Sequence, residues 1–256
     1  MPLDRKVLSH CPNLKMISVA FAGVDHIDME YCHNNNILVS NAADYSTKSV
    51  AELTMGMIFS LYRDISWGDA QTRNLKNRQN HLGTELFGKT IGIIGLGRIG
   101  HQVAEYAKIF GCKVIAYNRS KKDISGVDQV TLPELLEESD IVSIHVPLTG
   151  ETKGLIGATE INSMKEEAIL INTARGPIVN YAALARALVE DKIAGAALDV
   201  YEHEPPIEKD HPILSAPNTL LLPHLGFATS EAIDKRSEII IENIRQWLKN
   251  SPKNVM

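Results

Sequence analysis

Apolar residues recur along this chain with two different periods, which separate expected strands from expected helices. Short apolar runs bounded by turn residues predict strands at 14–20, 37–40, 91–94, 113–117, 141–145, 168–172, 194–199 and 220–222. Apolar positions at helical spacing predict helices at 99–110, 132–138 and 181–190. The regular alternation of strand and helix from residue 91 onward predicts an α/β fold with a doubly wound parallel sheet of six strands.

The segments on either side of this alternation differ from it. Residues 49–73 predict one long helix, apolar nearly all round its first half, which is typical of a helix between domains or in a subunit contact. Residues 74–83 are polar and weakly periodic, as in an exposed arm. A last helix at 230–250 can fold back onto the first segment. We therefore expect a small discontinuous domain at 1–81 and 227–256, with only two strands, and a larger domain at 82–226.

Composition excludes several classes of protein. The 256 residues carry a net charge of -5 and no extended Lys/Arg tract, which argues against nucleic acid or an anionic membrane as the main partner. No run approaches the roughly 18 apolar residues of a membrane span. The histidines and cysteines do not cluster at metal-ligand spacing, so we expect no metal. Three widely spaced cysteines without a C-x-x-C pair fit reduced thiols in the cytoplasm.

The sequence GLGRIG at 95–100 is the most informative motif, because it follows an expected strand and opens an expected helix. Gly95 allows a tight turn, Gly97 lets the backbone approach a pyrophosphate, and Gly100 lets the helix pack close to the strand. The free N–H groups of the helix N-terminus then point at the phosphates. The motif therefore predicts a dinucleotide site.

The tip of the next strand leaves the choice of dinucleotide open. Sites for NAD place an acidic residue roughly 20 residues beyond the glycines, on the ribose 2′-OH. This chain offers Asn118, Arg119 and Ser120 instead. The cluster of Arg119 with Lys121 and Lys122 could be a solvated strand tip, although its position beside the expected ribose favours binding of a phosphate.

Polar residues at the ends of the later strands are candidates for chemistry, because strand ends meet at the ligand crevice of such a sheet. Arg175 is placed to clamp a carboxylate through its planar fork. His224 is a candidate general acid or base, and a nearby carboxylate from Asp199 or Glu204 would favour its imidazolium form. Hydride transfer to a carbonyl needs such a proton donor and an orienting cation.

Each of these side chains also has a purely structural interpretation. Arg175 could form a surface ion pair, and His224 could be a loop histidine that only satisfies its hydrogen bonds. His145 sits at the end of another expected strand, where we favour plain packing over a role in catalysis.

Seven segments in order resemble the D-isomer-specific 2-hydroxyacid dehydrogenase family, which includes D-lactate dehydrogenase, glycerate dehydrogenase, hydroxypyruvate reductase and 3-phosphoglycerate dehydrogenase. They are AGVDHID at 22–28, SVAE at 49–52, GKTIGIIGLGRIG at 88–100, HVPLT at 145–149, NTARG at 172–176, AALDVYEHEP at 196–205 and PHLG at 223–226. The resemblance implies a Rossmann domain, a smaller flavodoxin-like substrate domain and a homodimer. It also suggests that this chain lacks the first strand, helix and second strand of the substrate domain.

The resemblance assigns roles to the candidate residues. It implies that Arg175 binds the substrate carboxylate and carbonyl, that His224 is the acid/base, and that Glu204 pairs with this histidine. Substrate contacts are also expected from the backbone around Ala22, Gly23 and Val24 and from Tyr45. Asp199 would lie near the nicotinamide amide. The expected cofactor contacts are Gly95, Gly97, Arg98, Ile99, Gly100, Asn118, Arg119, Ser120, Val146, Pro147, Thr152, Thr173, Ala174, Arg175, Asp199, His224 and Gly226.

The sequence thus predicts a two-domain oxidoreductase that reduces a small 2-oxo acid, such as glyoxylate or hydroxypyruvate, to the D-2-hydroxy acid. Family members specific for NAD carry an aspartate at the position of Asn118, so we expect NADP(H) in preference to NAD(H), which stays possible. Two alternatives remain at this point: a nucleotide-sensing protein like the corepressors of the same family, and an inactive truncated dehydrogenase.

Overall fold

The computed structural model describes residues 2–122, 124–203 and 206–256, and the chain divides into two units. Unit 1 comprises Met1–Thr47 with Phe227–Met256, and unit 2 comprises Lys48–Gly226. The first division falls well before the predicted boundary after residue 81. The reason is that helix α3 (Thr47–Tyr62) packs into the same apolar core as Ile91 and Ile93, which belong to unit 2.

Among its described residues, unit 2 contains a sheet of seven strands in the order β5-β4-β3-β6-β7-β8-β9, and every neighbouring pair is parallel. The strands are β3 (Thr90–Ile94), β4 (Lys113–Tyr117), β5 (Asp128–Gln129), β6 (Ile141–Ile144), β7 (Ile169–Asn172), β8 (Gly195–Leu198) and β9 (Thr219–Leu221). The six expected strands are confirmed. The prediction missed β5, an edge strand of two residues, which is too short to show a period.

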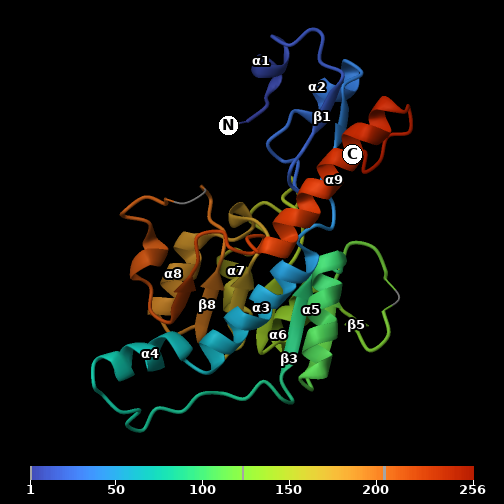
Figure 1. Ribbon diagram of the computed structural model, residues 1–256. Coiled ribbons are helices and arrows are strands. Elements are labelled where there is room, and N and C mark those ends of the chain that lie inside the picture. Colours follow the sequence, from blue (N-terminus) through green and yellow to red (C-terminus); the bar gives the residue numbers. More distant parts are fainter. Residues whose placement is uncertain (1, 123, 204–205) are drawn as a thin grey trace. The chain divides into compact units, whose positions relative to one another are not determined.

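Helices cover both faces of this sheet (Figure 1), so alternate residues of one strand enter different cores. Ile93 contributes to the core beneath α3 and α5, whereas the next residue, Ile94, contributes to the core beneath α6 and α8. The remaining elements of unit 2 are α4 (Ile65–Arg73), α5 (Arg98–Ile109), α6 (Leu132–Glu138), α7 (Ala158–Asn162), η1 (Gly176–Ile178), α8 (Tyr181–Val189) and η2 (Pro212–Ser215).

The helix expected at 49–73 is two helices, so this prediction is wrong in detail. Helix α3 ends at Tyr62 and α4 begins at Ile65, because Asp64 between them adopts a left-handed conformation with φ of 48°. In a continuous helix, the carbonyl of Tyr62 would accept a hydrogen bond from the N–H four residues later. Here it accepts instead from the N–H of Thr84, at 2.6 Å, where the chain comes back after α4. The chain after Arg73 forms the exposed arm that the sequence predicts.

Unit 1 consists of α1 (Arg5–Leu8), β1 (Met16–Ser18), α2 (Met29–Asn34), β2 (Leu38–Ser40) and α9 (Ser230–Leu248). Strands β1 and β2 are parallel, in the register Met16 to Leu38. Helix α9 packs on the chain that follows β2, where the buried Asn243 amide donates to Asn41 O at 2.9 Å. Asn254 donates to the Asn243 amide oxygen at 2.8 Å, so the C-terminal segment is joined to the same site.

Candidate active site

The glycine turn joins β3 to α5. Strand β3 lies at the switch point of the sheet, because β4 and β5 follow on one side of it and β6 to β9 follow on the other. Gly95 has a φ of 102°, which strongly favours glycine, and its N–H donates to Tyr117 O at 2.9 Å. A Cβ on Gly100 would lie 2.0 Å from Gly95 O, so only glycine lets the helix approach this closely. At Gly97, the N-cap of α5, a Cβ would meet no atom within 4 Å. This open N-terminus fits a pyrophosphate.

The strand tip after β4 is tied to the glycine turn by its first polar side chain. Asn118 accepts from Leu96 N–H at 3.1 Å through its amide oxygen and donates to Ser120 O at 2.6 Å through its amide nitrogen. Arg119 lies beside Glu151, with 3.3 Å between Nη1 and Oε2. Sequence reasoning missed Glu151, because it is 32 residues from Arg119 and belongs to the loop after β6.

That loop after β6 is closed by its own threonines. Thr152 Oγ1 donates to Pro147 O at 2.6 Å and accepts from Thr149 N–H at 2.8 Å. His145, at the start of the loop, has its Nε2 2.8 Å from Ser143 Oγ. Burial lowers the pKa of His145 to about 3, so its ring is neutral at physiological pH. These features agree with the structural interpretation of His145.

Arg175 follows β7 on a loop that a buried amide shapes. Asn172 is fully buried, accepts from Ala174 N–H at 3.0 Å and donates to Arg175 O at 3.0 Å. The same amide nitrogen lies 3.4 Å from the hydroxyl of Tyr181, which donates to Val200 O at 2.5 Å. These contacts fix the backbone on both sides of the Arg175 side chain.

His224 follows β9, and the backbone directly after it is held by the buried carboxylate of Asp199, which follows the neighbouring strand β8. Asp199 is only 1% exposed, and it accepts from Leu225 N–H at 2.7 Å and Gly226 N–H at 2.8 Å. His224 itself has a φ of 59°, a left-handed conformation that is uncommon for a non-glycine residue. Asp199 N–H also donates to Asn172 O at 3.0 Å, so the two side-chain networks meet at adjacent strand ends.

The ends of β7, β8 and β9 therefore place Arg175, Asp199 and His224 at the same edge of the sheet as the glycine turn. Glu204, the expected partner of His224, lies outside the described residues, and its role stays a prediction. Arg98 and Ile99 open α5, and Thr173 and Ala174 lie on the Arg175 loop. A Cβ on Gly95 would lie 2.8 Å from the Val146 side chain, which places Val146 beside the glycine turn.

The substrate residues expected in unit 1 are described within that unit alone. Ala22 O accepts from the Asn41 amide at 2.7 Å, and Val24 O accepts from Ile27 N–H at 2.9 Å. Tyr45 is only 6% exposed, and the Arg236 guanidinium lies 5.9 Å from its ring centroid. The ring of Tyr45 is thus largely buried inside unit 1, which sequence reasoning did not anticipate.

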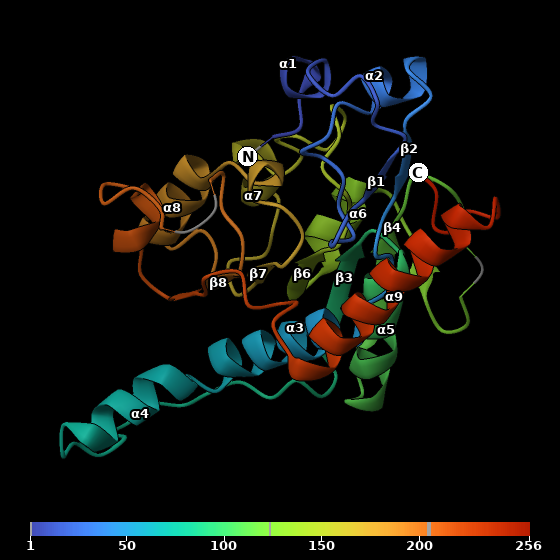
Figure 2. The ribbon, with the colours of Figure 1, turned by 45° about the horizontal axis from the view of Figure 1, so that its top comes forward.

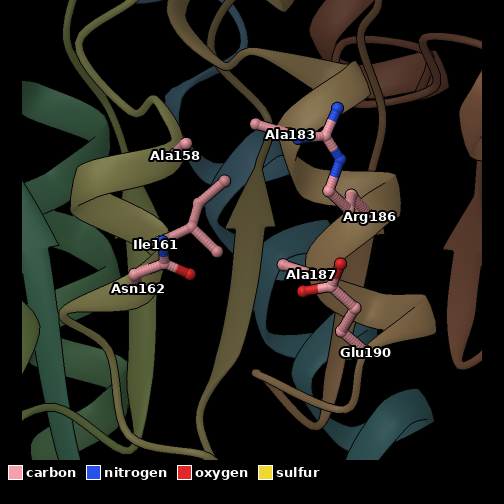
Figure 3. A pocket seen from close by; sticks show the side chains of 7 residues that line it. All are labelled: Ala158, Ile161, Asn162, Ala183, Arg186, Ala187 and Glu190. Carbon is pink, nitrogen blue, oxygen red and sulfur yellow. The ribbon is translucent and has the colours of Figure 1, made fainter.

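A separate hollow of about 240 Å³ lies between α7 and α8 (Figure 3). Its lining residues are Ala158, Ile161, Asn162, Ala183, Arg186, Ala187 and Glu190, and none of them belongs to the expected site. Within residues 2–122, 124–203 and 206–256, no three His, Cys, Asp or Glu side chains are placed to share a metal ion. The same part of the chain contains no helix long and apolar enough to cross a membrane.

The parallel sheet and the glycine turn at its switch point define a dinucleotide-binding protein of the doubly wound α/β class. Residues 55–226 match the family model described as D-isomer specific 2-hydroxyacid dehydrogenase, NAD binding domain. The chain belongs to this family.

Three similar proteins illustrate the relationship. A D-3-phosphoglycerate dehydrogenase of Methanocaldococcus jannaschii is 42% identical over 96% of this chain, which spans only 48% of that protein. A glyoxylate reductase of Thermococcus litoralis is 39% identical over 99% of this chain and 80% of its own length. The structure of an acyclic imino acid reductase in complex with NADPH and D-Arg superposes with a TM-score of 0.95 at 34% identity, covering 100% of this chain and 83% of that one.

Proposed function

We propose that the protein interconverts a small 2-oxo acid and its D-2-hydroxy acid with a nicotinamide cofactor. The observation that carries this proposal is the placement of Arg175 and His224 at the sheet edge that also holds the glycine turn, each on a loop fixed by a buried side chain. The glyoxylate reductases among the relatives support a substrate as small as glyoxylate or hydroxypyruvate.

Each candidate residue has a defined task in this proposal. Arg175 holds the carboxylate through two parallel N–H donors and polarises the carbonyl, and His224 delivers a proton to the carbonyl oxygen. A reduced nicotinamide supplies the hydride when bound. Glu204 supports the protonated form of His224. From unit 1, backbone N–H groups of Ala22, Gly23 and Val24 bind the substrate carboxylate. Tyr45, also in unit 1, contributes a further contact with the substrate.

Two substitutions test these roles. His224→Ala should lower kcat steeply and leave cofactor binding intact, whereas near-normal turnover would remove His224 from the acid/base role. Arg175→Lys should mainly lower kcat/KM for the 2-oxo acid, because lysine cannot reproduce the planar fork; an unchanged kcat/KM would exclude Arg175 from the site. His33→Ala and Arg186→Lys are matched controls, since both side chains are exposed and lie outside the proposed site.

We further propose that NADP(H) is preferred to NAD(H). The strand tip presents Asn118, Arg119 and Ser120 in place of the aspartate of NAD sites, whose carboxylate would repel a 2′-phosphate. Arg119 offers charge-assisted hydrogen bonds to this phosphate. The NADPH complex of the similar imino acid reductase gives this choice a precedent. Steady-state rates with NADPH and NADH in parallel, over a panel of 2-oxo acids, test both the substrate class and the cofactor.

A homodimer and a cytoplasmic location complete the proposal, with no nucleic acid or membrane as partner. Helix α4 and the exposed arm that follows it extend from the sheet of unit 2 (Figure 2). The chain between α4 and β3 exposes Leu75 by 96%, Leu82 by 79% and Phe87 by 77%, which favours a second copy covering them. Leu82→Asp should give a monomer in multi-angle light scattering. The matched variant Ile109→Asp, 78% exposed on α5, should not; an unchanged mass for Leu82→Asp would exclude the arm as the interface.

A further inference from the structure

The ion pair between Arg119 and Glu151 connects the segments that follow β4 and β6, the two strands next to β3. Arg119 follows β4 and Glu151 belongs to the loop after β6, and these strands lie on either side of β3 (Figure 2). Arg119 Nη1 and Glu151 Oε2 are 3.3 Å apart at the carboxyl ends of the strands. The pair therefore lies at the edge of the sheet where the adenosine end of a dinucleotide binds.

Glu151 has a defined place, because the loop that carries it is closed by hydrogen bonds. The next residue, Thr152, donates to Pro147 O at 2.6 Å and accepts from Thr149 N–H at 2.8 Å. The two side chains are nevertheless 87% and 76% exposed, so water and salt screen their attraction and a bound anion can separate them.

We propose that Glu151 is a specificity-determining residue that competes with the cofactor 2′-phosphate for Arg119 and so limits the preference for NADPH over NADH. The inference rests on the proposed role of Arg119 at that phosphate. A phosphate monoester carries nearly two negative charges at neutral pH, so it gains from the guanidinium and is repelled by the carboxylate beside it. A ribose with a free 2′-OH carries no such charge, so its binding depends little on the Arg119 guanidinium or the Glu151 carboxylate.

The direction of the effect follows from these charges. Removing the carboxylate frees Arg119 and removes one repulsion, so the affinity for a 2′-phosphate rises while the affinity for the unphosphorylated nucleotide is unchanged. Because the pair is exposed, we expect a gain of about two- to fivefold at low salt, and a smaller gain at high salt. Glutamine in place of Glu151 keeps the length of the side chain and the hydrogen bonds of the loop.

Calorimetric titration of the full chain with adenosine 2′,5′-bisphosphate and with 5′-AMP tests the inference without any turnover. Glu151→Gln should tighten binding of the bisphosphate about two- to fivefold and leave the Kd of 5′-AMP unchanged. Arg119→Ala should weaken binding of the bisphosphate alone, and Glu151→Gln should have a smaller effect in that background. Glu166→Gln, an exposed carboxylate before β7 at the opposite edge of the sheet, is the control and should change neither Kd.

The outcomes separate the two proposals. If Glu151→Gln leaves the Kd of the bisphosphate unchanged, or tightens both nucleotides equally, while Arg119→Ala weakens the bisphosphate, the inference about Glu151 is wrong and the NADPH preference stands. If Arg119→Ala changes neither Kd, the proposed contact with the 2′-phosphate is wrong, and the role of Glu151 falls with it. Catalytic activity is not needed for either result, so a failure of the proposed reaction is distinguishable from both.

Discussion

Replacing Asp199 by asparagine should disturb the position of the loop that carries His224 and so lower activity, while the protein still folds. The carboxylate is buried and its two oxygens accept from Leu225 N–H and Gly226 N–H, at 2.7 and 2.8 Å. Asparagine has the same shape but one acceptor oxygen, and it turns an NH₂ group toward the second backbone donor. The substitution therefore removes one of the two bonds and leaves a donor facing a donor beside His224.

The expected magnitude follows from the chemistry of that bond. A hydrogen bond to a charged group contributes about 1.5–3 kcal/mol, and a tenfold change in rate corresponds to about 1.4 kcal/mol. If the whole loss appears in the transition state, kcat/KM for the 2-oxo acid falls about 10- to 150-fold. Any part of the lost hydrogen-bond free energy that does not appear in kcat/KM should appear as a lower free energy of unfolding.

The assay compares three quantities in Asp199→Asn: kcat/KM for the 2-oxo acid, the Kd of NADPH from direct titration, and the free energy of unfolding in urea. The matched control is Asp140→Asn, because Asp140 accepts from Thr90 N–H at 2.7 Å at the opposite, amino-terminal edge of the sheet. We expect the control to lose stability and keep kcat/KM. A normal kcat with a weakened Kd of NADPH in Asp199→Asn would refute the positioning role and favour a contact with the nicotinamide amide instead.

Three further predictions concern the cofactor and stability. Asn118→Asp should shift the ratio of kcat/KM values toward NADH by about tenfold, and an unchanged ratio would contradict the preference assigned to the strand tip. Gly100→Ala should weaken nucleotide binding in a calorimetric titration, because its Cβ would lie 2.0 Å from Gly95 O; an unaltered Kd would contradict the need for close packing. Burial raises the pKa of Asp140, but hydrogen bonds from the Thr90 N–H and Lys165 lower it more, so the folded pKa lies below its ordinary value. Its contribution to stability is then present above the ordinary aspartate pKa of about 4 and lost as the pH falls through the lower folded pKa. Urea unfolding should therefore show Asp140→Asn less stable than the parent at neutral pH and equally stable in acid; a difference that persists in acid would contradict the assignment.

Much of the fold could be predicted because buried parallel strands are continuous apolar runs. The runs at 91–94 and 141–145 became β3 and β6 almost residue for residue. The break between α3 and α4 could not be predicted, since the apolar pattern continues across it. The break depends on a left-handed Asp64 and on Thr84 taking the carbonyl of Tyr62, a contact between residues 22 positions apart in the sequence.

The candidate site shows the same division between local and distant information. The glycine turn is visible in six consecutive residues, and the strand-end rule placed Arg175 and His224 at one edge of the sheet. The positioning contacts were not visible, because Asp199 reaches the backbone after His224 from another strand. Glu151 was missed for the same reason, as its proximity to Arg119 exists only once β4 and β6 flank β3.

The three similar proteins described above are enzymes, and none of them supports the corepressor-like alternative. The most direct test of the proposed function is therefore the oxidation of NADPH by the purified full chain with glyoxylate or hydroxypyruvate, measured for the parent protein and for His224→Ala side by side. We predict substrate-dependent oxidation by the parent protein, with a D-2-hydroxy acid as product, and a steep loss of rate in His224→Ala. Equal rates in the two proteins, or no oxidation by the parent protein with any small 2-oxo acid, would contradict the account.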